Sequence, residues 1–216
     1  MNRSLNTYCN FMLERKKRRA AEPSLIPSEY EEVQCLISSG NQRINTGWSA
    51  AGYAQDTIQI HAKFSVIGNQ SQVAVLGNAW NTWAILWQIE GTTIEFFWGD
   101  WPYIGATLPL GTIYDVVYSQ RKVKVNGTVI NKSSDRGDLR TFGDVHVFEC
   151  AGHYSKIQLY YLKIYASTTA GVQGNEIRNM IPVVRKSDNK PGLYDTTSKT
   201  FFTNMNSGVD FTYESL

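Results

Sequence analysis

Apolar and polar residues alternate along one short stretch of this chain after another, and this pattern constrains the fold more than any other feature. From Ile58 to Val66 every second residue is apolar, as in a β-strand with one face in a core and one in water. Comparable stretches recur at residues 73–76, 83–89, 93–98, 113–118, 123–125, 128–130, 145–150 and 157–165. About twelve short strands without a convincing helix after residue 27 predict an all-β chain folded as an antiparallel jelly-roll β-sandwich.

Turn signals separate these strand-like stretches. Seventeen glycines are scattered among them, which suits a protein with many tight turns. Asn126 and Gly127 lie between two of the stretches and can both adopt positive φ, so they predict a type I′ hairpin turn. The residues Glu90-Gly91-Thr92 predict a second hairpin between residues 83–89 and 93–98.

The chain length fits one domain with an extension. A chain of 216 residues exceeds a single domain of roughly 150 to 200 residues, which can bury one sizeable core. We expect a basic N-terminal arm and linker over residues 1–27 and a β-sandwich domain over residues 28–216. Apolar residues of the arm recur at helical spacing, so residues 4–21 predict a short helical or extended arm ending before Pro23. Those apolar residues are Leu5, Tyr8, Cys9, Met12 and Leu13.

The arm also carries a run of five basic residues, Arg15, Lys16, Lys17, Arg18 and Arg19. Such a run is typical of a nuclear-localisation or nucleic-acid patch, or of a solvated arm that meets an anionic surface. No further basic stripe or stacking platform follows it, which favours the second interpretation. We therefore expect these residues to dock on a partner protein and expect no nucleic-acid partner.

The same N-terminal residues contain no secretory signal. Their longest apolar run spans only three residues, 11–13, whereas a signal peptide needs roughly 7 to 15. No stretch approaches the roughly 18 apolar residues of a membrane helix, so we expect a chain made in a cytoplasm without a membrane partner. Cys9, Cys35 and Cys150 are odd in number and widely spaced, which favours buried free thiols over a disulfide.

Two segments carry a family resemblance. Residues 30–47 combine an aromatic residue with a Ser-x-Gly-x-Gln and an Ile-Asn-Thr-Gly motif, and residues 157–204 combine a strand-like run, an Ile-Pro-Val-Val motif and an aromatic hairpin. The resembling residues of the second segment are Tyr161, Lys163, Ile164, Tyr165, Arg178, Ile181, Pro182, Val183, Arg185, Asp188, Gly192, Leu193, Tyr194, Asp195, Lys199, Phe201, Phe202, Thr203 and Asn204. Together the segments resemble the concanavalin A-like lectin/glucanase superfamily, in the LamG-like modules of phage and gut-bacterial surface proteins.

The resemblance brackets residues 30–213 and implies a complete concanavalin A-like jelly roll. With the missing secretory signal, it implies a non-enzymatic structural or decoration protein of a bacteriophage virion, made in the host cytoplasm. The arm would contact other virion proteins, and the lectin-like domain would bind host or mucosal glycans. A free-standing carbohydrate-binding module is the alternative, and a glycoside hydrolase is a weaker one. A homo-oligomer is compatible with the sequence, although no heptad or repeat supports it.

Candidate catalytic groups are sparse. A retaining glycosidase needs two carboxyl groups about 5 to 5.5 Å apart, and the glucanase relatives carry them on a Glu-x-Asp-x-(x)-Glu strand that this sequence lacks. Glu90, Glu95 and Asp100 are spaced by five, so alternation along one regular strand would put successive members on opposite faces. No nucleophile motif or metal-ligand spacing accompanies the histidines, which are His61, His146 and His153. We expect no catalytic residue, no metal and no cofactor.

Aromatic residues gather in the middle of the chain, where five of the six tryptophans lie within residues 80–101. Such rings pack in a core or stack on a sugar or a protein partner. Alternation places Trp87 and Gln88 on opposite faces, and we expect at least half of the rings in the core. A loop that follows has the composition of a sugar-binding loop, with a carboxylate beside two rings. We predict its residues Asp100, Trp101 and Tyr103 as ligand-binding residues.

Overall fold

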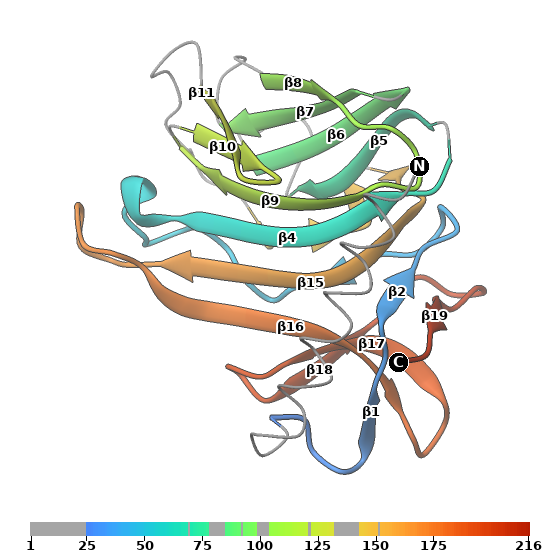
Figure 1. The fold of residues 1–216 in the computed structure, drawn as a ribbon. Coiled ribbons are helices and arrows are strands. Elements are labelled where there is room, and N and C mark those ends of the chain that lie inside the picture. The colour runs from blue at the N-terminus through green and yellow to red at the C-terminus, as the bar shows by residue number, and fades with distance from the viewer. Residues whose placement is uncertain are drawn as a thin grey trace.

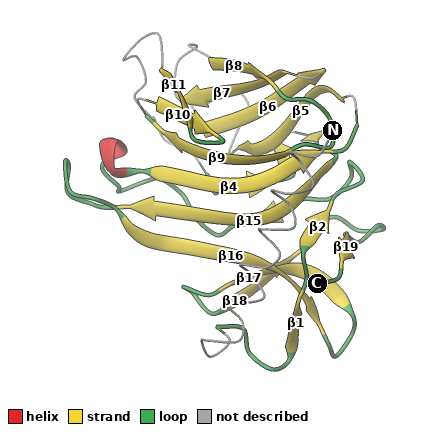
Figure 2. Ribbon diagram, viewed as in Figure 1, coloured by secondary structure: helices red, strands yellow, loops and turns green. Residues whose placement is uncertain are grey.

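The computed structural model describes residues 25–68, 70–77, 85–91, 93–98, 104–120, 122–131, 143–150 and 152–216. These residues form two β-sheets that pack face to face (Figure 1). The single helical element within these ranges is a 3-10 turn, η1 (Gln55–Thr57) (Figure 2). The predicted all-β antiparallel sandwich is confirmed, while most of the N-terminal arm, residues 1–24, lies outside the described ranges.

Eleven strands within these ranges form the larger sheet. Its main path runs in the order β11 (Thr128–Asn131), β10 (Lys122–Val125), β9 (Ile113–Ser119), β4 (Gln59–Val66), β15 (Ile157–Ala166), β16 (Asn175–Arg185), β17 (Lys190–Asp195) and β18 (Thr200–Thr203). Beside this path, β1 (Tyr30–Glu32) pairs with β16, and β2 (Cys35–Ile37) pairs with both β15 and β19 (Thr212–Glu214). Strands β1 and β2 of the first segment that carries the family resemblance are therefore neighbours of the second segment in one sheet.

The smaller sheet has eight strands in the described part of the chain. Its path runs in the order β13 (Glu149–Cys150), β14 (His153–Tyr154), β5 (Gln70–Gly77), β6 (Ile85–Gly91), β7 (Thr93–Trp98) and β8 (Ile104–Thr107), and β12 (His146–Val147) pairs with β5 and β3 (Ile44–Asn45). Strand β14 runs parallel to β5, where Tyr154 lies opposite Ala74, and the other described pairs are antiparallel. The sheet thus brings the short strand β14 beside a long central one.

Strand prediction from alternation is accurate for most of the long strands, but β16 (Asn175–Arg185) was expected only from its Ile-Pro-Val-Val motif and begins earlier than that motif. The predicted stretch 145–150 divides into β12 and β13 at Phe148, whose φ of 72° breaks the extended backbone. Three short strands, β8, β14 and β19, were not predicted, because two to four residues are too few to show a period of two. The Asn126-Gly127 turn is confirmed, since both residues have positive φ, 48° and 85°.

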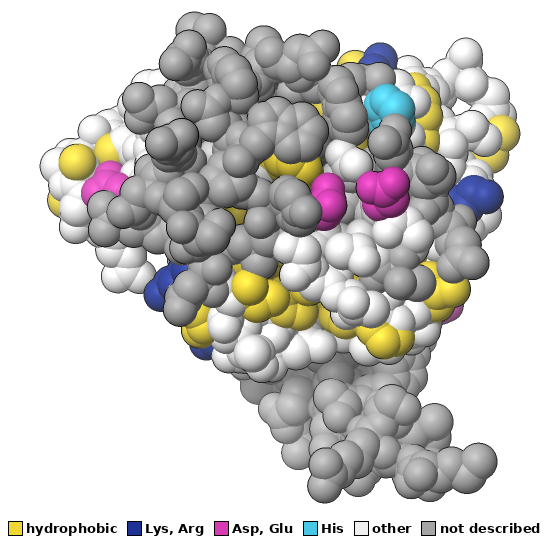
Figure 3. All heavy atoms as spheres, turned by 90° about the horizontal axis from the view of Figure 1, so that it is seen from above, with side chains coloured by type: hydrophobic (Ala, Val, Ile, Leu, Met, Phe, Trp, Pro, Cys, Tyr) yellow, Lys and Arg dark blue, Asp and Glu magenta, His cyan; other side chains and the backbone are white. Residues whose placement is uncertain are grey.

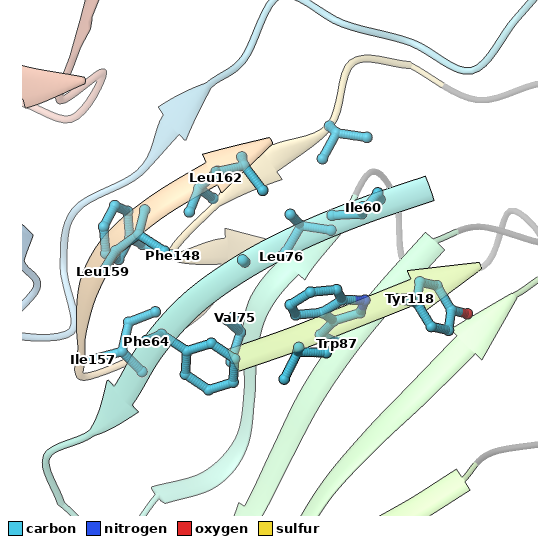
Figure 4. Close-up of a cluster of buried hydrophobic side chains, with 14 of the residues drawn as sticks. Ile60, Phe64, Val75, Leu76, Trp87, Tyr118, Phe148, Ile157, Leu159 and Leu162 are labelled. Atoms are coloured by element: carbon cyan, nitrogen blue, oxygen red, sulfur yellow. The ribbon is translucent and has the colours of Figure 1, made fainter. Parts of the chain in front are cut away.

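Aromatic side chains fill much of the space between the sheets (Figure 4). The ring centroid of Trp87 lies 5.4 Å from that of Phe96 and 5.8 Å from that of Tyr118. Trp98 lies 5.3 Å from the same tyrosine ring. Complete burial raises the pKa of the Tyr118 hydroxyl well above its ordinary value, since an ionised phenol is disfavoured away from water. The aromatic residues of β6 and β7 therefore serve the core, as alternation predicted.

The cysteines of the described part agree with the sequence as well. Cys35 and Cys150 are both free thiols, and both are buried. Cys150 packs with Ala74 and Phe97 in a small apolar cluster separate from the main core. Cys9 lies outside the described ranges, so the prediction stands confirmed for two of the three cysteines.

The aromatic hairpin at residues 190–203 is organised by one buried carboxylate, Asp195. Its Oδ1 accepts hydrogen bonds from the backbone N–H groups of Asn179 and Thr197 at 2.8 and 3.1 Å, and its Oδ2 accepts one from Ser198 at 3.2 Å. The Nε of Arg178 lies 3.6 Å from Oδ2. A buried charge is tolerated when it is paired and hydrogen-bonded in this way, so the residues of this hairpin have a structural role.

Candidate functional site

The ligand-binding residues predicted from the sequence, Asp100, Trp101 and Tyr103, lie outside the described residues. The same is true of the predicted docking residues, which are Arg15, Lys16, Lys17, Arg18 and Arg19. The last described residue before the predicted loop, Trp98, is fully buried in the core. Both sets of residues stay predictions, and the candidate site described next comes from other parts of the chain.

A pocket opens where three loops meet beside β2 and β19. These two strands are labelled on the right of Figure 1. The loops are residues 38–43 after β2, residues 153–156 around β14, and residues 204–210 between β18 and β19. The cavity has a volume of about 520 Å³, within the usual range for small-ligand sites. Its lining residues are Asn41, Tyr154, Met205, Asn206, Ser207 and Val209.

Gln42 holds the first of these loops in place. Its Oε1 accepts hydrogen bonds from the Ser38 hydroxyl and the Ser39 N–H, each at 3.0 Å, and from the Asn41 N–H at 3.2 Å. Its Nε2 donates to the carbonyl oxygen of Asp210 at 3.1 Å. The side chain is 1% exposed, so few water molecules can replace these bonds. The Ser-x-Gly-x-Gln motif therefore shapes the loop and ties it to the far end of the chain.

Asn204 organises the third loop in the same manner. Its Oδ1 accepts hydrogen bonds from the N–H groups of Arg43 and Asn206, both at 3.1 Å, and its Nδ2 donates to the Val209 carbonyl at 2.8 Å. The side chain of Asn206 in turn donates from Nδ2 to the Asn41 carbonyl at 2.8 Å. The pocket is consequently built on cross-linked loops that hold a defined shape.

The lining of the pocket combines polar groups with apolar ones and contains no charged side chain. In the described part of the chain, no hydrogen bond engages the side-chain amide of Asn41 or the hydroxyls of Tyr154 and Ser207. The Met205 and Val209 side chains are 52% and 54% exposed. Such a site offers solvent-accessible donors and acceptors, one aromatic ring and two apolar contacts to a ligand.

A charged network lies beside the pocket and supports strand β14. Glu149, opposite Tyr154 in the ladder, is buried, and its carboxylate lies 3.2 Å from His146 Nδ1 and 3.7 Å from Arg43. Burial acts to raise the pKa of Glu149, but hydrogen bonds from His146 and the Gly152 N–H outweigh it and hold the pKa below its usual value. The charges next to the pocket are thus already paired within the protein.

A second polar cluster occupies the larger sheet, on strands β4, β9 and β15. His61 Nε2 lies 2.6 Å from Asp115 Oδ1, and the Tyr161 hydroxyl lies 3.0 Å from His61 Nε2 and 3.1 Å from Asp115 Oδ2. Burial acts to raise the pKa of Asp115, but the bonds from His61 and Tyr161 hold it below its usual value. Burial and the nearby Asp115 charge raise the pKa of Tyr161. Each polar group of this cluster already has a partner.

The placement of two candidate carboxylates differs from the expectation. Glu90 and Glu95 lie on adjacent strands of one hairpin, where Gln88 pairs with Glu95 and Glu90 pairs with Thr93. Cross-strand partners share a face, as do residues two apart on one strand, so both glutamates lie on the same face of the smaller sheet. The expectation of opposite faces was wrong because the turn at Gly91 reverses the chain between them. Burial and the Glu90 charge raise the pKa of Glu95.

Other kinds of site find little support among the described residues. Within these ranges no group of three or more His, Cys, Asp or Glu side chains could hold a metal ion. No described helix is long and apolar enough to cross a membrane. On the face seen from above in Figure 3, acidic, basic and apolar side chains of the described residues are interspersed. The described residues of that face present no dominant charge sign.

The pocket was not predicted from the sequence, although two of the loops that build it carry recognisable motifs. The motifs around residues 38–47 and 201–204 support the family resemblance, and the following residues Asn204-Met205-Asn206-Ser207 were not predicted to form a site. A run of amide and hydroxyl residues after a rigid hairpin is a usable signal, because binding residues concentrate on loops held by a scaffold. Tyr154, on a strand of two residues, gave no such signal.

Comparison with known proteins identifies the fold and leaves the family open. No protein-family model matches the sequence, and no curated protein matches it. Among solved structures, the chain is similar to a Bacteroides ovatus protein that is described, provisionally, as carbohydrate-binding, with a TM-score of 0.57 and 10% sequence identity. The match covers 85% of this chain and 61% of that one, so this chain spans about three fifths of its structural relative. The likeness supports the β-sandwich fold.

Proposed function

We propose that this protein is a non-enzymatic carbohydrate-binding module and that the three-loop pocket is its binding site. The observation that carries this proposal is the lining itself, which joins the ring of Tyr154 to free amide and hydroxyl groups of Asn41 and Ser207. Sugars present an apolar C–H face that stacks on an aromatic ring and hydroxyls that both donate and accept hydrogen bonds. The pocket offers partners for both.

The rigidity of the loops supports the same proposal. The side chains of Gln42 and Asn204 fix the pocket through seven hydrogen bonds, each 3.2 Å or shorter. Six of these bonds are to backbone groups and one is to the Ser38 hydroxyl. A site that is already ordered loses less entropy when a small polar ligand binds. The provisional role of the Bacteroides ovatus relative belongs to the same class, although a shared fold alone is weak support for a shared ligand.

Glycan binding by paired variants tests the proposal. A glycan array identifies a ligand, and titration calorimetry then compares Tyr154→Ala with Tyr213→Ala. Tyr213 is a matched control because it is 41% exposed on β19 and does not line the pocket. Tyr154→Ala should weaken binding about tenfold or more, since it removes the stacking ring, while Tyr213→Ala should leave it unchanged. Equal affinities for the two variants would place the site elsewhere.

A glycoside hydrolase remains the alternative, and one observation favours it. Glu90 and Glu95 share a face, and the raised pKa of Glu95 is the property of a general acid. We propose binding without hydrolysis because the pocket residues lie on other loops. Incubation of the purified protein with soluble and insoluble glycans, followed by a reducing-end assay, distinguishes the two. Release of sugars that Glu95→Gln abolishes would establish hydrolysis and overturn the non-enzymatic proposal.

A place on a bacteriophage virion stays a prediction from the sequence. It depends on the family resemblance, on the missing secretory signal and on the basic run at residues 15–19, which lies outside the described residues. Mass spectrometry of purified particles tests it, because a decoration protein must co-purify with the particle. The glycan-binding proposal is compatible with either outcome, since a virion protein can carry a binding module.

A further inference from the structure

We infer that the pocket prefers a neutral sugar that carries an acetamido group, an N-acetylhexosamine, over the corresponding plain hexose. This inference rests on the proposed carbohydrate-binding function and adds the class of sugar. Three properties of the pocket support it: its lack of unpaired charge, its two exposed apolar side chains and its free amide groups.

The charges around the pocket exclude an anionic sugar as the preferred ligand. All six lining residues are uncharged. The neighbouring Arg43 guanidinium lies 3.7 Å from the carboxylate of Glu149, and Lys190 lies 3.7 Å from the carboxylate of Asp210. A carboxylate, sulfate or phosphate on the ligand would compete with Glu149 and Asp210 for these two cations, and would have to lose water to do so.

The apolar part of the lining suits a methyl group. Met205 and Val209 are among the most exposed large apolar side chains of the described residues, at 52% and 54%, and both line the same pocket. The apolar C–H face of a plain hexose is used on the Tyr154 ring in the proposed site, and the ring edge that would meet Met205 and Val209 carries hydroxyls. An acetamido methyl can, and burying one methyl corresponds to about a fourfold gain in affinity.

The free amide groups complete the match. The Asn41 side chain retains an acceptor oxygen and an N–H₂ donor, and Asn206 retains its Oδ1 after its Nδ2 has bonded to the Asn41 carbonyl. An acetamido group presents one N–H and one C=O a short distance apart. Because the amide is trans, these two groups point in opposite directions and can engage two separate partners of the lining, such as the Asn206 Oδ1 and the Asn41 side-chain amide. With the methyl contact, this predicts a preference of about tenfold or more.

Matched disaccharides test the inference on the full-length protein. Diacetylchitobiose and cellobiose share ring stereochemistry and linkage and differ only in their acetamido groups. N-acetyllactosamine and lactose form a second matched pair, and 3′-sulfolactose, which carries a charge and no acetamido group, provides the anionic arm. Titration calorimetry should give the acetamido sugar of at least one pair about tenfold tighter binding than its plain partner, and no gain from the sulfate.

Variants then locate the preference. Val209→Thr replaces one apolar methyl by a hydroxyl of nearly the same size and should reduce the preference about threefold to fourfold, with little effect on the plain sugar. Val172→Thr is its control, because Val172 is 50% exposed on a loop outside the pocket. Asn41→Ala should lower the preference further. A preference that survives both pocket variants would overturn the assignment to this pocket.

The outcomes separate the inference from the function on which it rests. Equal binding of the paired sugars, or tighter binding of the anionic one, would overturn the acetamido preference and leave carbohydrate binding intact. No binding to these sugars or to any member of a broad array would overturn the proposed function itself. Binding of the acetamido sugars alone, weakened by Val209→Thr and not by Val172→Thr, would support both.

Discussion

The three-loop pocket and the His61–Asp115–Tyr161 cluster are both polar, and they differ in how their polar groups are satisfied. On the larger sheet, strand positions bring the three side chains within 2.6 to 3.1 Å of one another. In the pocket, the side chains of Asn41, Tyr154 and Ser207 have no hydrogen-bond partner among the described residues. A polar group that already has a partner loses it when a ligand binds, so free polar groups mark the better binding site.

The largest expected effect comes from Gln42→Ala, which removes the side chain that holds the first loop of the pocket in place. The substitution leaves the buried hydroxyl of Ser38 and the N–H groups of Ser39 and Asn41 without their acceptor. Unpaired buried polar groups are costly, so the free energy of unfolding should fall by about 2 to 4 kcal/mol. Chemical denaturation followed by tryptophan fluorescence measures this loss.

Binding distinguishes this effect from general destabilisation. At a temperature where Gln42→Ala remains folded, its glycan affinity should still be lower than that of the unmodified protein, because the loop that carries Asn41 has lost its support. Unchanged affinity in the folded variant would mean that the loop keeps its shape without Gln42.

A smaller effect is expected from Asp115→Ala, which disrupts the His61–Asp115–Tyr161 cluster. The substitution removes two short hydrogen bonds on a partly exposed face, and we expect a loss of about 1 kcal/mol in the free energy of unfolding. Glycan affinity should not change, because this cluster lies on strands outside the pocket lining. Calorimetric titration of Asp115→Ala with the best ligand checks this, and a clear loss of affinity would make the larger sheet a second binding surface.

The smallest expected effect is a change in pH dependence at Glu149. Its pKa in the folded protein lies below the usual value, which is about 4.3 in an unfolded chain. The unfolded chain therefore binds more protons between these two values, so this contribution is fully present above about pH 4.3 and is lost as the pH falls through the folded pKa. Thermal unfolding from pH 7 down to pH 3 should show a shallower acid-induced loss for Glu149→Gln than for the unmodified protein. Identical losses of thermal stability with falling pH in the two proteins would mean that Glu149 does not contribute to the acid sensitivity of folding.

Sequence alone was sufficient for the architecture, because alternation is a local property. Residues 58–66, 113–118 and 157–165 reveal their strands through the period of their own side chains. The Asn126-Gly127 turn is equally local, since it depends on the backbone freedom of two residues. Glu90 and Glu95 show the limit of such reasoning. Their shared face depends on where one turn reverses the chain.

The pocket could not be predicted because its residues meet only through the topology. Asn41, Tyr154 and Asn206 come from three loops separated by long stretches of sequence. Their approach depends on β2 pairing with β15 and β19, and on the parallel placement of β14 beside β5. No residue type or spacing in the sequence encodes that juxtaposition directly, whereas a motif for a metal or a nucleophile would have done so.

The hydrogen bond from Gln42 to Asp210 joins residues 168 positions apart, and this has a consequence for how the protein folds. Contacts between distant residues are slow to form, because a long loop must close before they contribute. During synthesis, the segment around Gln42 leaves the ribosome long before its partner and cannot adopt its final loop. The pocket is therefore among the last features to assemble, and glycan binding would report on completed folding more stringently than the spectroscopic signal of the buried tryptophans does.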